Sequence, residues 1–218
     1  MLSKTKTTTR LFKGIYQYKI VLICAGARWF RSGDMTSTLE QLSNITLKEN
    51  TTSGNAFYNA TPNGRTTIKT KEELDYAFKL CKQIKKIKDI DIRVEGAWIS
   101  VYTNLKSDID ALIKLNPDNV KYISVPPADT TLSSDTIIMP KINYDFRITL
   151  GKTTQNYDSF IQWAESNKKV KLTKSCKKDL SRDRSWGGTH FYITGDNNLL
   201  MAKMHLGGCI GKVQRIIK

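Results

Sequence analysis

The chain repeats one pattern of apolar and polar positions twice. Residues 69–86 align without a gap on residues 152–169, and in both stretches apolar side chains recur three and four positions apart, as on one face of an amphipathic helix. A second match sets residues 99–123 against residues 191–217. Its paired residues are Ile109 and Leu200, Ala111 and Ala202, and Leu115 and Leu206. The two matches predict a duplicated structural unit.

Each half of the chain reads as strand, helix, strand, strand, helix, strand. In the first half we expect strands at 18–24, 90–95, 98–103 and 120–125, and helices at 71–87 and 107–115. In the second half we expect strands at 144–150, 170–175, 190–194 and 213–217, and helices at 156–167 and 198–206. Thr70, and Thr153 or Thr154, are suitable helix N-caps. The order βαββαβ predicts an α+β protein of two tandem ferredoxin-like units with antiparallel sheets.

The domain organisation follows from this repeat. The first unit is expected over 1–125, a turn-rich linker over 126–143 and the second unit over 144–218. A long insertion at about 25–68 separates the first strand from the first helix. We expect a short helix at 36–42 there, and a mobile loop in the Asn-, Thr- and Gly-rich run that follows.

Strand alternation predicts which side chains face away from the helices. Ile99 and Val101 belong to the core, as do Phe191 and Ile193. The residues between and beside them therefore face outward: Trp98, Ser100, Tyr102, His190 and Tyr192, together with Arg93, Arg147 and Thr149 on neighbouring strands. Aromatic rings flanked by cations are what single-stranded nucleic acids bind, because bases stack on rings and cations hold phosphates. The alternative is that these rings pack against the other repeat or another subunit.

Charge favours a polyanionic partner. The chain carries 35 Lys and Arg against 20 Asp and Glu, a net charge of +15. A dense basic block spans residues 168–184. The block and the loop after it contribute the candidate nucleic-acid-binding residues Lys174, Lys177, Lys178, Arg182, Arg184 and Trp186. The alternative is a solvated basic surface that only keeps the protein soluble.

The stretch Arg28-Trp29-Phe30-Arg31 at the start of the insertion has two readings. It can form a clamp in which the rings stack on a base and the arginines neutralise phosphate. Alternatively, Trp29 and Phe30 plug the end of the first core while Arg28 and Arg31 are solvated.

Catalytic and metal-binding chemistry has little support in the sequence. His190 is a weak candidate for a general base in metal-free RNA cleavage, with Arg182, Arg184 and Lys174 as cations for the phosphate. The four cysteines have no metal-ligand spacing and are expected to be reduced, mostly buried thiols. We expect no metal, no cofactor and no membrane span, and a cytoplasmic setting or a particle assembled there.

The topology resembles RNA recognition motif domains and, as a tandem pair, the RAMP endoribonucleases of CRISPR systems. The aromatic signature of the third strand is not met by "EGAWISVYT" or by "GGTHFYIT". The stretches "YQYKIVLICAGARWFR" and "RDRSWGGTHFYITG" are similar to uncharacterised proteins of tailed phages. From the charge, the outward-facing rings and the resemblance in topology, we expect a non-enzymatic protein that binds single-stranded RNA, or less readily DNA. The phage resemblance indicates a host cytoplasm or virion as its setting. Two alternatives are a structural or adaptor protein, bound to other proteins of a viral particle or polymerase assembly, and a RAMP-like endoribonuclease.

Overall fold

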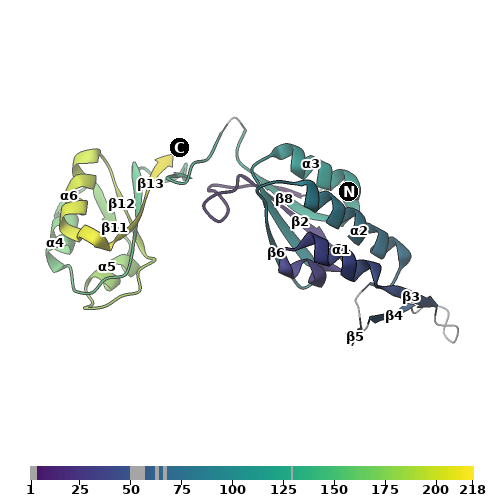
Figure 1. Ribbon diagram of the computed structural model, residues 1–218. Helices are drawn as coiled ribbons and strands as arrows, with labels where there is room; N and C mark the ends of the chain where they lie inside the picture. Colours follow the sequence, from purple (N-terminus) through teal and green to yellow (C-terminus); the bar gives the residue numbers. More distant parts are fainter. Residues whose placement is uncertain (1–3, 50–56, 62–63, 66–67, 129) are drawn as a thin grey trace. The chain divides into compact units, whose positions relative to one another are not determined.

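A computed structural model describes residues 4–49, 57–61, 64–65, 68–128 and 130–218 of the chain (Figure 1). The chain divides into two compact units, Met1–Thr131 and Leu132–Lys218. Each unit is a mixed α+β structure with its own core, and its described strands include one five-stranded sheet. We call them unit 1 and unit 2.

The sheet of unit 1 has the order β1-β8-β2-β7-β6. Its strands are β1 (Lys4–Thr7), β2 (Tyr18–Ile23), β6 (Asp91–Glu95), β7 (Trp98–Thr103) and β8 (Val120–Val125). Neighbouring strands are antiparallel except β1, which pairs parallel with β8. The fully buried residues Ile20, Leu22, Ile99 and Val101 face the helices.

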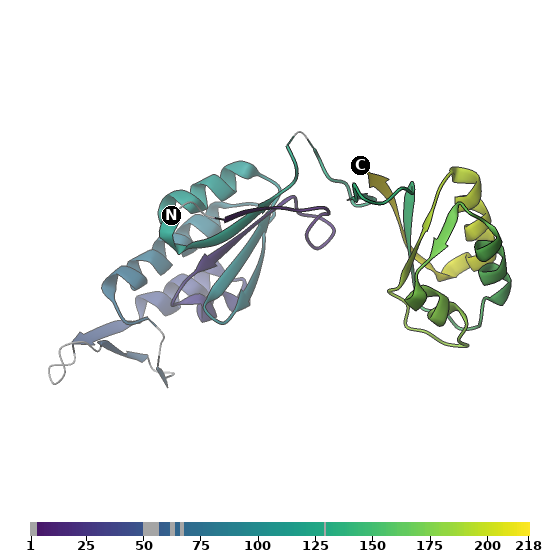
Figure 2. The ribbon, with the colours of Figure 1, turned by 180° about the vertical axis from the view of Figure 1, so that it is seen from behind.

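Helices of unit 1 cover one face of this sheet (Figures 1 and 2). They are η1 (Ala27–Ser32), α1 (Met35–Ser43), α2 (Lys71–Lys86), α3 (Lys106–Leu115) and η2 (Pro117–Asn119). Thr70 is confirmed as the N-cap of α2, where it forms a reciprocal capping box with Glu73. The expected helix at 36–42 is confirmed as part of α1.

The remainder of the insertion contains three short strands where we expected a mobile loop. They are β3 (Thr46–Glu49), β4 (Phe57–Thr61) and β5 (Gly64–Arg65), and they pair antiparallel in a separate sheet. The parts of the expected loop at 50–56, 62–63 and 66–67 lie outside the described residues.

Unit 2 has the sheet order β11-β12-β10-β13-β9. Its strands are β9 (Thr136–Ile138), β10 (Phe146–Leu150), β11 (Val170–Leu172), β12 (His190–Ile193) and β13 (Ile210–Ile217). Its helices are α4 (Asp158–Ser166), α5 (Lys174–Leu180), α6 (Asp196–Leu206) and η3 (Gly207–Cys209). Part of the segment expected as a linker therefore supplies an edge strand, β9.

The five-stranded sheets of the two units each contain both antiparallel and parallel strand pairs. The expectation of purely antiparallel sheets is therefore wrong. In each unit one additional strand precedes the six repeated elements and pairs parallel with the last strand, as β1 does with β8 and β9 with β13. No periodic pattern predicted these strands because β1 and β9 are only four and three residues long. Their pairing depends on residues more than 70 positions away, such as Thr136 and Arg215.

The second expected match is shifted by one residue. Helix α3 begins at Lys106 and α6 at Asp196, and the strands before them end at Thr103 and Ile193. This equivalence pairs Ile109 with Leu199 rather than with Leu200. The burial pattern agrees, because Leu199 packs against the core and Leu200 is 59% exposed.

The basic block also contains a helix where we expected the end of a strand. The strand expected at 170–175 ends at Leu172, because Thr173 caps the new helix α5 by accepting a hydrogen bond from the Cys176 amide. Cys176 and Leu180 anchor α5 in the core of unit 2. Three candidate cations, Lys174, Lys177 and Lys178, therefore lie on a helix.

Candidate functional site

Arg147 lies in the centre of the unit 2 sheet, on the face opposite the helices. It is opposite Tyr192 of β12 on one side and Gln214 of β13 on the other. Its Nε atom is buried and has no hydrogen-bond partner, and among the described residues Arg147 forms no ion pair. Leaving a buried donor unpaired costs free energy, so contacts within unit 2 alone do not explain an arginine at this position.

His190 links Arg147 to Tyr192. Its Nδ1 atom lies 3.4 Å from Arg147 Nη2, and its Nε2 atom lies 3.1 Å from the Tyr192 hydroxyl oxygen. Burial, and secondarily the charge of Arg147, lower the pKa of His190 below its ordinary value, so the ring is neutral at pH 7. Because the guanidinium can only donate, Nδ1 accepts and Nε2–H donates to Tyr192. The Tyr192 hydroxyl then accepts from His190 and keeps its own proton as a donor.

Tyr192 itself is not the open stacking platform that the alternation predicted. Its side chain is only 8% exposed, because Tyr144 stacks on it with ring centroids 5.9 Å apart and Ile137 and Ile216 pack beside it. The ring does lie on the expected face. The expectation of exposure is wrong because the segment before β10 folds back across that face.

Trp186 is the most exposed of the large apolar side chains described, at 89%. The backbone of its loop is nevertheless fixed to the rest of unit 2. Ser185 and Thr153 exchange backbone hydrogen bonds of 2.9 and 3.2 Å, and the Gly188 amide donates to the Leu150 carbonyl at 2.8 Å. Gly187 has a φ of +75°, and a Cβ atom there would lie 2.2 Å from the Gly151 carbonyl oxygen. The loop therefore holds an exposed indole on an ordered support.

Further cations surround this region, and alternation could have identified them. Lys152 places its Nζ atom 5.3 Å from the centroid of the Trp186 ring. By strand register, Lys171 lies opposite Tyr192, and Lys212 lies opposite Thr149, which is itself opposite His190. Both lysines are exposed and alternate with apolar neighbours in "VKL" and "GKV". The sheet face of unit 2 thus carries Arg147, Lys171 and Lys212, and the Trp186 loop lies at the end where β10 stops and β12 begins.

The other sequence-predicted cations of unit 2 are placed less centrally. Arg182 and Arg184 are exposed in the same loop as Trp186. Lys174, Lys177 and Lys178 belong to α5, which packs on the helical side of the sheet, so they are not brought beside Arg147. Lys177 is already paired with Glu165.

The sheet face of unit 1 is also covered. Tyr102 is only 6% exposed, because Phe12 and Tyr16 place their rings 5.8 and 6.3 Å from its ring. The prediction that Tyr102 is an open platform is therefore wrong for the same reason as for Tyr192.

Two other candidate residues of unit 1 are exposed but already contact neighbouring side chains. Trp98 is 43% exposed and has the Lys121 ammonium 2.8 Å from its ring centroid. Arg93 is exposed and forms a 2.5 Å ion pair with Glu95. These two side chains of unit 1 therefore already have partners within the unit.

The second reading of the Arg28–Arg31 stretch is correct. Phe30 is fully buried and Trp29 is 9% exposed, and both belong to the core of unit 1. Arg28 and Arg31 are exposed, and the Arg28 guanidinium lies 3.9 Å from the Trp29 ring centroid. The two rings cannot stack on a base, so the clamp reading is wrong for them.

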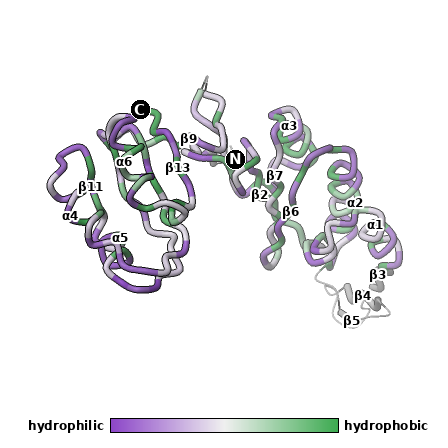
Figure 3. The backbone as a smooth tube through the Cα atoms, turned by 60° about the vertical axis from the view of Figure 1, so that its left-hand side comes forward, coloured by the Kyte–Doolittle hydropathy of each residue, from purple (hydrophilic) through white to green (hydrophobic). Residues whose placement is uncertain are grey.

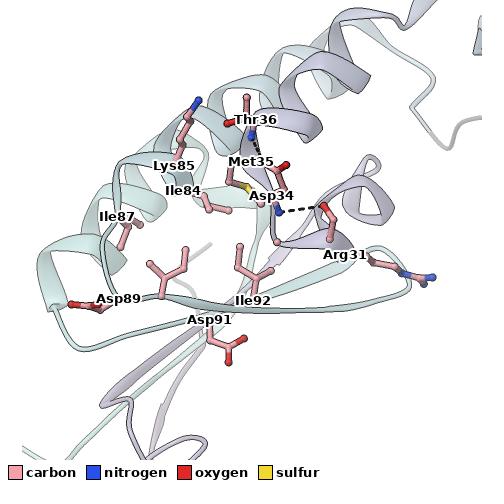
Figure 4. Close-up of a pocket in the computed structure, with 13 residues that line it drawn as sticks. Arg31, Asp34, Met35, Thr36, Ile84, Lys85, Ile87, Asp89, Asp91 and Ile92 are labelled. Atoms are coloured by element: carbon pink, nitrogen blue, oxygen red, sulfur yellow. Dashed lines mark hydrogen bonds between the residues drawn. The ribbon is translucent and has the colours of Figure 1, made fainter.

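Unit 1 has a surface hollow of about 600 Å³ between the start of α1, the end of α2 and β6. Ile84 and Ile92 project into it, whereas Lys85, Arg31 and Asp91 project away (Figure 4). Asp34 caps α1, and Asp91 is paired with Lys13. The hollow therefore lacks the converging polar groups of a catalytic site.

The cysteines are buried and unpaired, as expected. Burial raises the pKa of Cys24 to about 11 and that of Cys176 to about 12, so both remain protonated thiols at neutral pH. Among the described residues, no group of three His, Cys, Asp or Glu side chains could hold a metal ion.

No family model matches the chain, and neither the curated proteins nor the solved structures include a significant match. Within the described part of the chain, no helix is both long enough and apolar enough to cross a membrane.

Proposed function

We propose that each unit is a ferredoxin-like fold with one added edge strand. The strand orders β8-β2-β7-β6 and β13-β10-β12-β11, with antiparallel neighbours, support this assignment. In that fold the sheet face opposite the helices is free to bind ligands. This is the face that carries Arg147.

We propose further that the protein binds single-stranded nucleic acid, RNA in preference to DNA, without cleaving it. The observation that carries the proposal is the exposed Trp186, held on a fixed loop beside Lys152, at the end of a sheet face whose central Arg147 has no anionic partner among the described residues. A base stacks on the indole while the phosphates on either side pair with the cations. Thr149, on the same face, supplies a hydroxyl that can hydrogen-bond to a ribose 2′-hydroxyl.

Binding rather than cleavage is the activity that the geometry of His190 supports. A general base needs a nitrogen directed at the substrate hydroxyl. Both ring nitrogens of His190 already have partners within unit 2, so its role is to orient Arg147 and Tyr192. We place this activity in a host cytoplasm or a phage virion, where other viral proteins are additional partners.

The test is fluorescence anisotropy of labelled oligonucleotides of about 12 nucleotides, the scale of one single-strand binding site. We expect binding to single-stranded RNA that weakens steeply between about 50 and 200 mM salt, because released counterions contribute to the affinity. RNA incubated with the protein should remain intact. Absence of binding to RNA and DNA at the low salt concentration would contradict the proposal.

A further inference from the structure

Helix α6 of unit 2 exposes a strip of large apolar side chains. Leu200 is 59% exposed, Met201 40% and Met204 71%. These positions lie on the side of the helix opposite Ala202 and Leu206, which are buried in the core. Green, hydrophobic segments of α6 can be followed in Figure 3. The helix is therefore apolar on both its inner and its outer side.

The equivalent helix of unit 1, α3, has charged residues at the positions of this strip. With α3 and α6 aligned at their first residues, Lys106 and Asp196, the counterparts of Leu200 and Met204 are Asp110 and Lys114. The two helices thus occupy equivalent places in their units. The outer positions are charged in α3 and apolar in α6. The apolar strip is a specific property of unit 2, and its exposure favours a partner.

The charges beside the strip are self-complementary. Asp196 and Lys203 lie on the same flank of α6, seven residues apart, and neither has an ion-pair partner among the described residues. When two copies of a helix pack antiparallel, each flank meets the same flank of the other copy. Asp196 of one copy then lies near Lys203 of the other, twice by symmetry.

The opposite flank of the strip is apolar and aromatic. His205 lies there with its ring centroid 5.4 Å from that of Trp163 of α4, which is half-buried. With Asp196 opposite Lys203, the antiparallel arrangement brings this pair toward the first turn of α6 in the other copy. It therefore adds area beyond α6 alone.

We propose that the α6 surface, made of Leu200, Met201 and Met204 with Asp196 and Lys203, is the two-fold interface of a homodimer. An 11-residue helix is only about 16 Å long, so the interface is smaller than the roughly 800 Å² per partner of a standard stable complex. The dimer is accordingly weak, with a dissociation constant of about 10 to 100 μM. This inference does not depend on nucleic-acid binding.

Sedimentation equilibrium of the full chain tests the proposal over concentrations from about 1 to 200 μM, which bracket the expected dissociation constant. We expect a rising dimer fraction for the native chain. The double variant L200D/M204K, which copies the residues of α3, should raise the dissociation constant at least ten-fold. Leu105→Asp changes a side chain of unit 1 that is 60% exposed and should leave the dimer unchanged. Thermal unfolding shows whether each variant remains folded.

Charge reversal distinguishes the antiparallel pair from a non-specific apolar contact. Asp196→Lys and Lys203→Asp should each weaken the dimer, whereas D196K/K203D should restore it, because the reversed charges again face each other. A native chain that stays monomeric over the whole range would overturn the proposal. So would a double variant L200D/M204K that dimerises as well as the native chain, or a charge swap that fails to restore association.

Discussion

Tyr102 and Tyr192 occupy the same position in their two units. Each is the residue before the last in its strand, and each lies opposite a cation of the neighbouring strand, Lys19 or Arg147. The cations differ in their surroundings. The Lys19 ammonium lies 5.4 and 5.5 Å from the ring centroids of Tyr102 and Tyr122, whereas Arg147 retains a buried Nε without a partner. The equivalent cation therefore lies against two aromatic rings in unit 1, whereas in unit 2 it keeps a buried donor without a partner.

Replacing Arg147 should separate stability from binding. Arg147→Met keeps the length and apolar stem of the side chain and removes the unpaired donor, so we expect the free energy of unfolding to rise by about 1 kcal/mol. The same variant should bind single-stranded RNA at least ten-fold more weakly and show a shallower dependence of affinity on salt. Urea unfolding and anisotropy titrations measure the two effects.

Lys19→Met is the matched control in unit 1. Lys19 is already placed against two rings, so its loss should not stabilise the protein. If Arg147→Met destabilised the protein or bound RNA normally, Arg147 would be a structural residue instead.

Trp186→Ala should weaken RNA binding by about 1 to 3 kcal/mol, the value of one base stacked on an aromatic ring. Its free energy of unfolding should change little, because an indole that is 89% exposed buries almost no area. Anisotropy and urea unfolding of the same preparation give both values.

Trp98→Ala is the comparison for that prediction. Trp98 is 43% exposed, and the Lys121 ammonium lies against its ring, so its removal should affect RNA binding less than the removal of Trp186. Equal losses for the two variants would place the stacking on both units.

The sequence predicted the positions of helices and strands better than it predicted the exposure of their side chains. Helical and strand periods are local, and they located α2, α4, β2 and β12 to within a few residues. Alternation also placed Arg147 and His190 correctly on one face. These properties depend only on near neighbours along the chain.

The exposure of Tyr102 and Tyr192 could not be predicted in the same way. It depends on Phe12, Tyr16 and Tyr144, which come from segments with no periodic pattern of their own and cover the sheet only through tertiary packing. The strands β1 and β9 were missed for the same reason, since short edge strands are defined by the strand they pair with.

Gly187→Ala should disrupt the Trp186 loop. A Cβ atom would overlap the Gly151 carbonyl, and the residue would also have to keep a φ of +75°, so we expect a loss of about 3 kcal/mol in the free energy of unfolding, or a rebuilt loop. RNA affinity should fall to the level of Trp186→Ala, because the indole loses its support.

Gly188→Ala is the control for that substitution. Gly188 also has a positive φ, +86°, but an added Cβ atom would meet nothing within 4 Å. Its cost should be limited to the backbone strain of roughly 1 kcal/mol. Equal effects at the two positions would show that the close approach of Gly187 to Gly151 is unimportant.

The depressed pKa of His190 makes both stability and binding depend on pH. Since the folded state disfavours the imidazolium, the unfolded chain binds a proton first as the pH falls below the ordinary value of 6.5. The stability contributed by the neutral ring is therefore present above that pH and is lost as the pH falls through the lower pKa of the folded state.

His190→Gln cannot titrate, so its thermal midpoint should change less with pH over this range. Burial is the larger cause of this lowered pKa, and the charge of Arg147 is the smaller one. A phosphate bound at Arg147 would offset that charge, so the native protein should bind RNA more tightly as the pH falls from 7 toward 5, while His190→Gln should not. An identical pH dependence in the two proteins would show that His190 is not coupled to the binding face.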